Sequence, residues 1–112
     1  MEAQIIAAIS KAAPGVRCYH DAAPNQPSTP YVVLQRVGGA GHLHLDTETS
    51  DYEARLQLAV WHPDRLTVNR ISRDIEAALM RIDGVQPIGA AVADYDPTTS
   101  LRGMRQDFYI TE

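Results

Sequence analysis

The fold is decided by residues 51–84, which read DYEARLQLAVWHPDRLTVNRISRDIEAALMRIDG. In the first part of this stretch, apolar and polar side chains alternate along the chain, which predicts a strand with one buried face. The polar parity contains Glu53, Arg55 and Gln57, together with the small Ala59. The apolar parity contains Tyr52, Ala54, Leu56, Leu58 and Val60.

The second part of the stretch predicts an amphipathic helix from about residue 65 to residue 82. Pro63 stops the preceding strand, because it has no N–H to donate and keeps its predecessor out of the helical region. Apolar residues then recur at spacings of three and four, which places them in one stripe. Gly84 is well placed to end the helix as the C′ residue. The stripe consists of Leu66, Val68, Ile71, Ile75, Ala78, Leu79 and Ile82.

The remaining elements flank this unit. Before it we expect a helix, a short strand, a proline-rich loop and a strand closed by two glycines, over residues 3–12, 16–20, 21–30 and 31–37. After it we expect a strand, a turn cluster and a final strand, over residues 85–94, 94–100 and 101–111. The order is therefore α-β-β-β-α-β-β. This order predicts an α+β fold, with the central helix packed on one face of a mostly antiparallel sheet.

The composition is that of an ordinary globular domain. The chain has 112 residues, of which 45% are hydrophobic and 21% are charged, and we expect one domain over residues 1–112. A net charge of −4 without a Lys/Arg cluster argues against a nucleic-acid surface held by phosphate contacts. The N-terminal segment fits neither a secretory signal nor a membrane span, and the single Cys18 excludes an internal disulfide. We expect a cytoplasmic protein with no membrane partner.

Residues 38–50, GGAGHLHLDTETS, have the pattern of a hairpin arm that extends the two flanking strands. His42, His44 and Asp46 alternate within it, and their side chains would project to the same side. Imidazole and carboxylate groups in this spacing could ligate zinc or another divalent metal. The same spacing also fits the solvated polar face of an exposed arm. A small metal- or ligand-binding, enzyme-like domain that uses these three residues is therefore the alternative function.

Acid–base catalysis is a further possibility, since His20-Asp21 and His62-Pro63-Asp64 each place a carboxylate near an imidazole. Neighbouring strand residues point apart, however, and the sequence has no nucleophile elbow, phosphate-binding glycine loop or HExxH helix. We therefore expect no enzyme activity and no cofactor. Trp61 is either an anchor in an interface or a cap on the core beside the helix.

Three segments together suggest a family. They are TPYVVLQRVGG at residues 29–39, YEARLQLAVWHPD at residues 52–64 and DYDPTTSLRGMRQDFYI at residues 94–110. With the polar arm, they resemble the tail completion or tail terminator proteins of long-tailed bacteriophages and prophages. The resemblance extends from about residue 5 to residue 110. Two segments depart from the family pattern, namely the alanine-rich penultimate strand at residues 89–93 and the short first strand. They leave undetermined which strands form the edges of the sheet.

The resemblance implies a small structural subunit that forms a hexameric ring at the head-proximal end of the tail tube. Such a ring halts tube polymerisation and provides the surface to which the head is joined. The implied partners are other copies of the chain, the major tail tube protein and a head-completion or connector protein, and the chain could be a monomer before docking. The implied location is the bacterial cytoplasm during assembly and then the head–tail junction of the virion. A binding module for another protein is a third possibility, distinguished by whether the chain forms a closed homo-oligomer.

Two hypotheses concern surfaces. The first is that the arm reaches a neighbouring subunit or the tail tube, because it is glycine-rich and lacks a continuous apolar face. The second is that Asp46, Glu48 and Asp51 face a channel through which DNA passes, where like charge discourages sticking. The candidate interaction residues are Gly41, His42, His44, Asp46, Glu48, Asp51, Trp61, Arg102 and Arg105.

Overall fold

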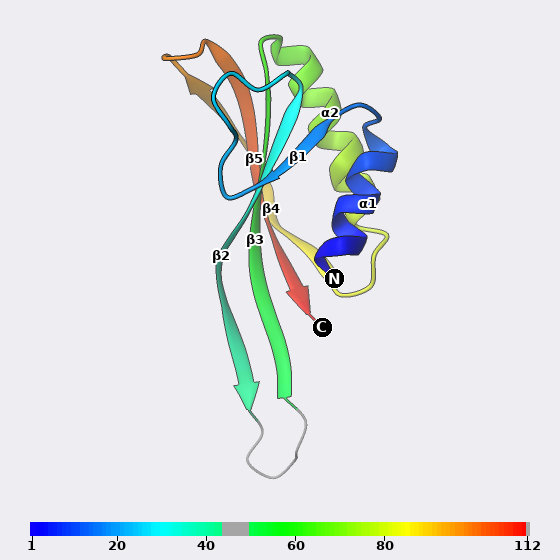
Figure 1. The fold of residues 1–112 in the computed structure, drawn as a ribbon. Coiled ribbons are helices and arrows are strands. Elements are labelled where there is room, and N and C mark those ends of the chain that lie inside the picture. Colours follow the sequence, from blue (N-terminus) through cyan, green and yellow to red (C-terminus); the bar gives the residue numbers. More distant parts are fainter. Residues whose placement is uncertain (44–49, 112) are drawn as a thin grey trace.

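The computed structural model describes the backbone of residues 1–43 and 50–111, and the side chains of residues 1–38 and 54–111. Within these residues, two helices lie on one side of a five-stranded sheet (Figure 1). The helices are α1 (Glu2–Ala12) and α2 (Arg65–Leu79). The strands are β1 (Arg17–His20), β2 (Tyr31–Leu43), β3 (Ser50–His62), β4 (Val85–Asp96) and β5 (Leu101–Thr111).

The predicted fold class and element order are confirmed. The strands lie in the order β1-β2-β3-β5-β4, and every neighbouring pair is antiparallel except β1 with β2. After α2 the chain enters the sheet at its far edge as β4, and a hairpin brings β5 back between β4 and β3. The short first strand and the alanine-rich penultimate strand are thus the two edges. Neither helix of the described chain is both long and apolar enough to cross a bilayer.

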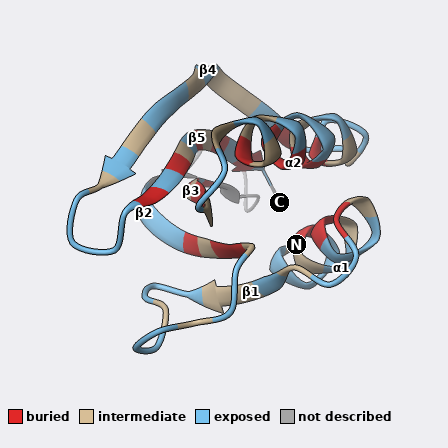
Figure 2. Cartoon of the chain, turned by 90° about the horizontal axis from the view of Figure 1, so that it is seen from above, coloured by how far each residue is buried: buried red, intermediate tan, exposed pale blue. Residues whose placement is uncertain are grey.

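The core lies between the two helices and the face of the sheet that they cover (Figure 2). The predicted alternation of β3 is confirmed over residues 54–60, since its apolar parity is buried while Arg55 is exposed. Burying each large apolar side chain contributes about 1.5–3 kcal/mol before chain entropy is subtracted. The most deeply buried side chains are Ile5, Ile9, Val32, Leu34, Leu56, Val60, Val68, Ile75, Leu79 and Phe108.

Helix α2 begins where the sequence predicts. Asp64 is its N-cap, with an extended backbone and a carboxylate that accepts the Thr67 N–H at 2.9 Å. The prediction that Leu66 belongs to the buried stripe is wrong, because this side chain is 75% exposed. At about 100° per residue, Leu66 lies about 180° around the helix from Ile75, so it faces solvent. Ser72 is buried in the stripe instead.

The end of α2 differs from the prediction. Its α-helical part stops at Leu79, and a turn with an Ile82 N–H to Leu79 C=O bond leads into β4. Gly84 is therefore not the C′ residue of the helix. It has a φ of 87°, and a Cβ atom there would strike the main-chain carbonyl oxygen of Thr111. Glycine is required at this turn by both its backbone conformation and this close approach.

Strand β2 continues past the two glycines that were expected to close it. It runs to Leu43 and pairs with β3 as far as Ser50. The register shifts between Arg36 and Gly38, and Gly38 has a φ of 141°. A glycine in this region of φ accommodates a bulge, so the strand bends and does not end. Strand β4 likewise continues two residues beyond its predicted end, to Asp96.

Candidate functional site

In the described part of the chain, no helix covers the second face of the sheet (Figure 2). The strand registers bring residues that are distant in sequence into one row across this face. Tyr31 of β2 lies opposite Trp61 of β3, and Trp61 lies opposite Gly103 of β5. Gly103 in turn lies opposite Asp94 of β4. Successive side chains of a strand alternate between faces, so this row points away from the buried parity that contains Val60.

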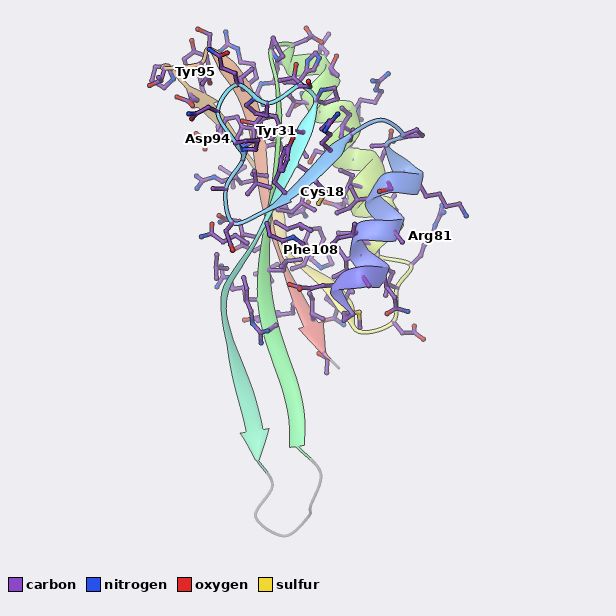
Figure 3. All side chains as sticks on the ribbon, in the orientation of Figure 1. Cys18, Tyr31, Arg81, Asp94, Tyr95 and Phe108 are labelled. Carbon is purple, nitrogen blue, oxygen red and sulfur yellow. The ribbon has the colours of Figure 1, made fainter. Side chains whose placement is uncertain are left out.

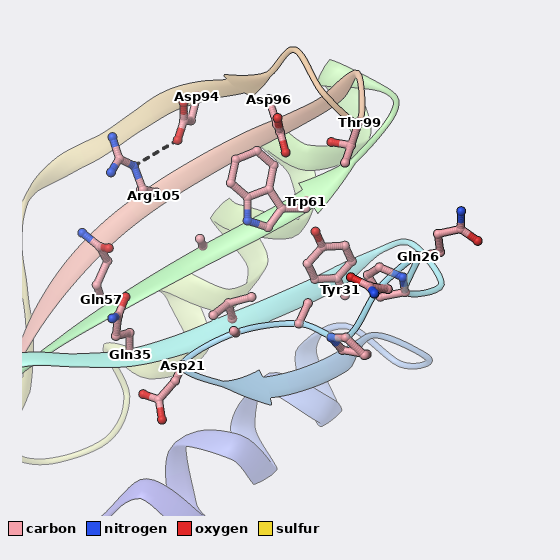
Figure 4. Close-up of a pocket in the computed structure, with 17 residues that line it drawn as sticks. Asp21, Gln26, Tyr31, Gln35, Gln57, Trp61, Asp94, Asp96, Thr99 and Arg105 are labelled. Carbon is pink, nitrogen blue, oxygen red and sulfur yellow. Dashed lines mark ion pairs between the residues drawn. The ribbon is translucent and has the colours of Figure 1, made fainter.

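A groove of about 460 Å³ follows this row (Figure 4). Tyr31 and Trp61 point into it from the middle of the sheet. The loop between β1 and β2 forms one wall with residues 21–27. The other wall comes from β4 and the turn that follows it, with Asp94 and Asp96. The groove therefore combines an aromatic floor with an acidic rim.

The aromatic floor depends on local packing. Tyr31 is buried and meets the ring of Tyr19 edge-on, with 6.0 Å between the ring centroids. Trp61 lies against Gly103, where a Cβ atom would come within 2.6 Å of its six-membered ring. Gly103 thus makes the space that the indole occupies. This position excludes the interpretation of Trp61 as a cap on the core beside the helix, because the helices pack on the other face.

The groove carries an excess of negative charge. Among the described residues that line it, Asp21, Asp94 and Asp96 are acidic and Arg105 alone is basic. Arg105 is neutralised, since its Nε lies 3.3 Å from Asp94 Oδ2. Neither Asp21 nor Asp96 forms an ion pair with any described residue. Burial raises the pKa of Tyr31, and electrostatic repulsion from the Asp96 carboxylate and from the neighbouring Tyr19 raises it further.

Two sets of contacts hold the strands that form the groove. Arg65, at the start of α2, donates to the carbonyl oxygens of Gly103 at 2.7 Å and Asp94 at 2.8 Å. It therefore ties β5 and β4 to the helix beside the aromatic row. Farther along the same face, Arg55 donates from Nε and Nη2 to Asp107 Oδ2, at 2.9 and 2.6 Å. A second hollow, of about 290 Å³, lies here beside the β4 bulge.

The structure brings together only some of the predicted interaction residues. Trp61 and Arg105 both line the groove. Arg102 has the other parity on β5, and its Cζ lies 4.3 Å from the centroid of the Tyr95 ring. The remaining candidates belong to residues 38–53. Gly41, His42 and Asp51 are in the paired ends of β2 and β3 with side chains outside the described set, and His44, Asp46 and Glu48 lie outside the described residues.

The structure leaves the metal hypothesis for His42, His44 and Asp46 untested, but it shows what His62 and Asp64 of the acid–base hypothesis contact. Among the described residues, no three His, Cys, Asp or Glu side chains gather in a way that could hold a metal ion. The set of His42, His44 and Asp46 falls outside that search. In His62-Pro63-Asp64, His62 Nδ1 accepts the Asp64 N–H at 3.0 Å, while the Asp64 carboxylate caps the helix. The hydrogen bonds from the Thr67 side chain and backbone lower the pKa of Asp64. The Asp64 carboxylate and the His62 ring therefore both make hydrogen bonds that stabilise the start of α2.

Apart from Trp61 and Arg105, sequence reasoning did not assign the groove residues to an interaction surface, and Tyr31, Asp94 and Asp96 are the most important of those missed. Asp94 and Asp96 are two residues apart, which is the signal of one strand face. The Asp-Tyr-Asp-Pro cluster favoured a turn over a continuing strand, so this signal was overlooked. Tyr31 offers no local signal, because its place in the groove depends on which strand lies beside β2.

Comparisons with known proteins assign the family from the sequence and show which solved structures share the fold. The family model of tail completion protein gp17 matches residues 4–111. The fold is similar to a chain in the virion of a native gene transfer agent particle, with a TM-score of 0.70, 16% identity, and coverage of 99% of this chain and 92% of that one. It is also similar to bacteriophage SPP1 gp17, with a TM-score of 0.59, 14% identity, and coverage of 99% and 87%. A search of curated protein sequences finds no match.

Proposed function

Because this chain belongs to the tail completion protein gp17 family and is a structural component of a phage tail, we propose that it closes the head-proximal end of the tail tube. In this role it terminates tube polymerisation and offers the surface to which the filled head is joined. The observation that carries the proposal is the family match over residues 4–111, which spans nearly the whole domain. The role requires no turnover and no cofactor.

The proposed working form is a hexameric ring between the tail tube and a head-completion or connector protein. A ring of identical chains needs two different surfaces on each chain that fit one another. Several unlike surfaces support such a closure. They are the outer sides of α1 and α2, the uncovered sheet face, and the two edge strands β1 and β4. The chain is proposed to be a monomer until it docks on the tube, after assembly in the host cytoplasm.

The arm at residues 38–50 is proposed to contact a neighbouring subunit or the major tail tube protein. Pairing of β3 with β5 begins at Glu53 and Thr111, whereas β2 and β3 stay paired out to Leu43 and Ser50. The β2–β3 hairpin thus extends beyond β5, and this favours a contact outside the domain (Figure 1). Asp46, Glu48 and Asp51 are proposed to face a channel through which DNA passes, where like charge discourages sticking.

Deleting the gene in a phage or an inducible prophage tests the proposed role. We expect DNA-filled heads without tails and free tail tubes that exceed the normal length, because nothing terminates the tube. Tail lengths and joined particles are counted by electron microscopy of negatively stained lysates. Expression of the wild-type chain from a plasmid is the control and should restore joined particles. Joined particles with tails of normal length in the deletion strain would contradict the proposal.

A shorter deletion tests the arm. Removal of residues 41–48 should leave the circular dichroism spectrum and the melting transition close to those of the full chain, since the core that the structure describes is built from other residues. The same deletion should abolish the restoration of joined particles. If joined particles still form at the wild-type level, the arm is not the contact.

A further inference from the structure

The floor of the groove on the uncovered sheet face contains two aromatic rings, the buried ring of Tyr31 and the partly exposed ring of Trp61. Trp61 rests on Gly103 and stays partly exposed, and Tyr31 lies opposite it on the next strand (Figure 4). The faces of such rings carry partial negative charge and attract cations within about 6 Å. The exposed part of the Trp61 ring, with Tyr31 beside it, therefore forms a surface suited to a cationic group.

The carboxylates at the rim of the groove also attract cationic groups. Asp94 is paired with Arg105, but Asp96 has no cationic partner among the described residues. The Asp96 carboxylate accepts only the Thr98 N–H at 3.0 Å among the hydrogen bonds described, which leaves its second oxygen available. Asp96 lines the same groove as Trp61 and Tyr31 (Figure 4), and its charge helps to raise the pKa of Tyr31. Rings and carboxylate thus converge on one space.

The chain already pairs its own arginines with a ring and with a carboxylate on β3, β4 and β5, and Figure 3 labels Tyr95, which supplies the ring. Arg102 lies over the ring of Tyr95, and Arg55 places two of its nitrogens on the carboxylate of Asp107. A guanidinium is planar, so it can stack on a ring and still donate hydrogen bonds from its edge. The groove offers the same chemistry, because it places the Trp61 ring and the Asp96 carboxylate in one lining.

Resting on the structural role above, we propose that the groove binds an arginine side chain of another structural protein of the particle, held between Trp61, Tyr31 and Asp96. The guanidinium stacks on the indole, and its edge donates to the Asp96 carboxylate. The wall formed by residues 21–27 contains Asp21 and no basic residue, so it adds to the attraction.

Charge separates this partner from the arm of a second copy. The arm, residues 38–50, contains two histidines, two acidic residues and neither Lys nor Arg. At neutral pH its net charge has the same sign as the groove, so the arm of a neighbouring subunit would be repelled there. The arm of a second copy is therefore disfavoured as the occupant, and we assign the groove to another protein that presents an arginine towards Asp96.

The sole tryptophan of the chain makes a direct test possible, because the indole N–H of Trp61 gives a single NMR signal. The probe is the peptide acetyl-Gly-Arg-Gly-Arg-Gly-amide, and its matched control replaces arginine by the neutral isostere citrulline. We expect the arginine peptide to shift the indole signal in a saturable way. The shift should weaken in about 0.5 M NaCl, where charges are screened within a few ångströms. The citrulline peptide should give little shift.

Asp96→Asn removes the proposed carboxylate partner and should weaken binding of the peptide by about five-fold or more. Asp83→Asn is the matched control, since it removes the same charge from the exposed turn after α2. Its binding should equal that of the wild type. The proposal is overturned if the indole signal does not move, if citrulline works as well as arginine, or if the two variants weaken binding equally. An indole shift that depends on protein concentration without peptide would assign the groove to a second copy instead.

The peptide-binding experiment and the gene deletion test different claims, so their results can be told apart. If the peptide fails to bind while the deletion still prevents head joining, only the groove assignment is lost. If the peptide binds as expected while the deletion strain makes normal particles, the tail role is wrong and the groove remains an arginine site.

Discussion

Phe108 and Tyr109 are neighbours on β5, and they show how differently the two faces of the sheet are used. Phe108 points towards the helices and is 1% exposed, whereas Tyr109 points the other way and is 43% exposed. The same division separates Val60 from Trp61 on β3. One parity of each strand supplies the core, and the other supplies a surface with aromatic and acidic groups. Substitutions on the two faces should therefore change different properties of the protein.

The largest expected difference between the faces is in stability. Phe108→Ala should lower the free energy of unfolding by about 3–5 kcal/mol, because it removes a buried ring and leaves a cavity. Tyr109→Ala should lower it by less than about 1 kcal/mol, because the ring is already partly in solvent. Urea unfolding followed by circular dichroism measures both. Equal losses for these adjacent residues would show that the uncovered face also carries the fold.

Gly103→Ala should bring a smaller loss, of about 1–3 kcal/mol, since the added methyl group forces the indole of Trp61 to move. The emission maximum of Trp61 should shift with it, which core substitutions elsewhere need not do. The control is a double-mutant cycle with Trp61→Val, in which the smaller side chain removes the clash. If Gly103→Ala costs the same with and without the indole, the contact between these two residues is not the cause.

Within α2, the contrast between covered and exposed positions should be just as clear. Leu66→Ser should change the free energy of unfolding by no more than about 0.5 kcal/mol, because the side chain already faces solvent. Ile75→Ala, in the buried stripe of the same helix, is the comparison and should cost about 2–5 kcal/mol. Thermal melts of the two variants provide the measurement. A large loss from Leu66→Ser would mean that the first turn of α2 is covered in solution.

The smallest expected effect is a pH dependence from the uncovered face. The folded state raises the pKa of Tyr31, so the native chain keeps this proton at pH values where the unfolded chain releases it. The free energy of unfolding should therefore fall as the pH rises above about 10. Urea unfolding between neutral and alkaline pH would detect the fall. Tyr31→Phe should make it shallower, and the remainder includes Cys18, whose pKa is also raised by burial.

Much of the framework could be predicted because it depends on local periodicity. The alternation in β3 and the stripe in α2 identified the buried parity of each element before any partner was known. The errors occurred where local signals compete. The spacing of Leu66 from its apolar neighbours fits the stripe, but its position around the helix axis places it on the solvent side. The glycines after Val37 permit a bulge as readily as the end of a strand.

The sequence by itself determined which elements form and which side of each element is apolar, because both depend on contacts between residues close in the chain. Only the tertiary structure decided that β5 lies between β4 and β3 and that Tyr31, Trp61, Gly103 and Asp94 share one row. Strand order and register are set by hydrogen bonds and packing between distant segments. The groove exists only once those distant segments are side by side, and for this reason no single stretch of the sequence predicts it.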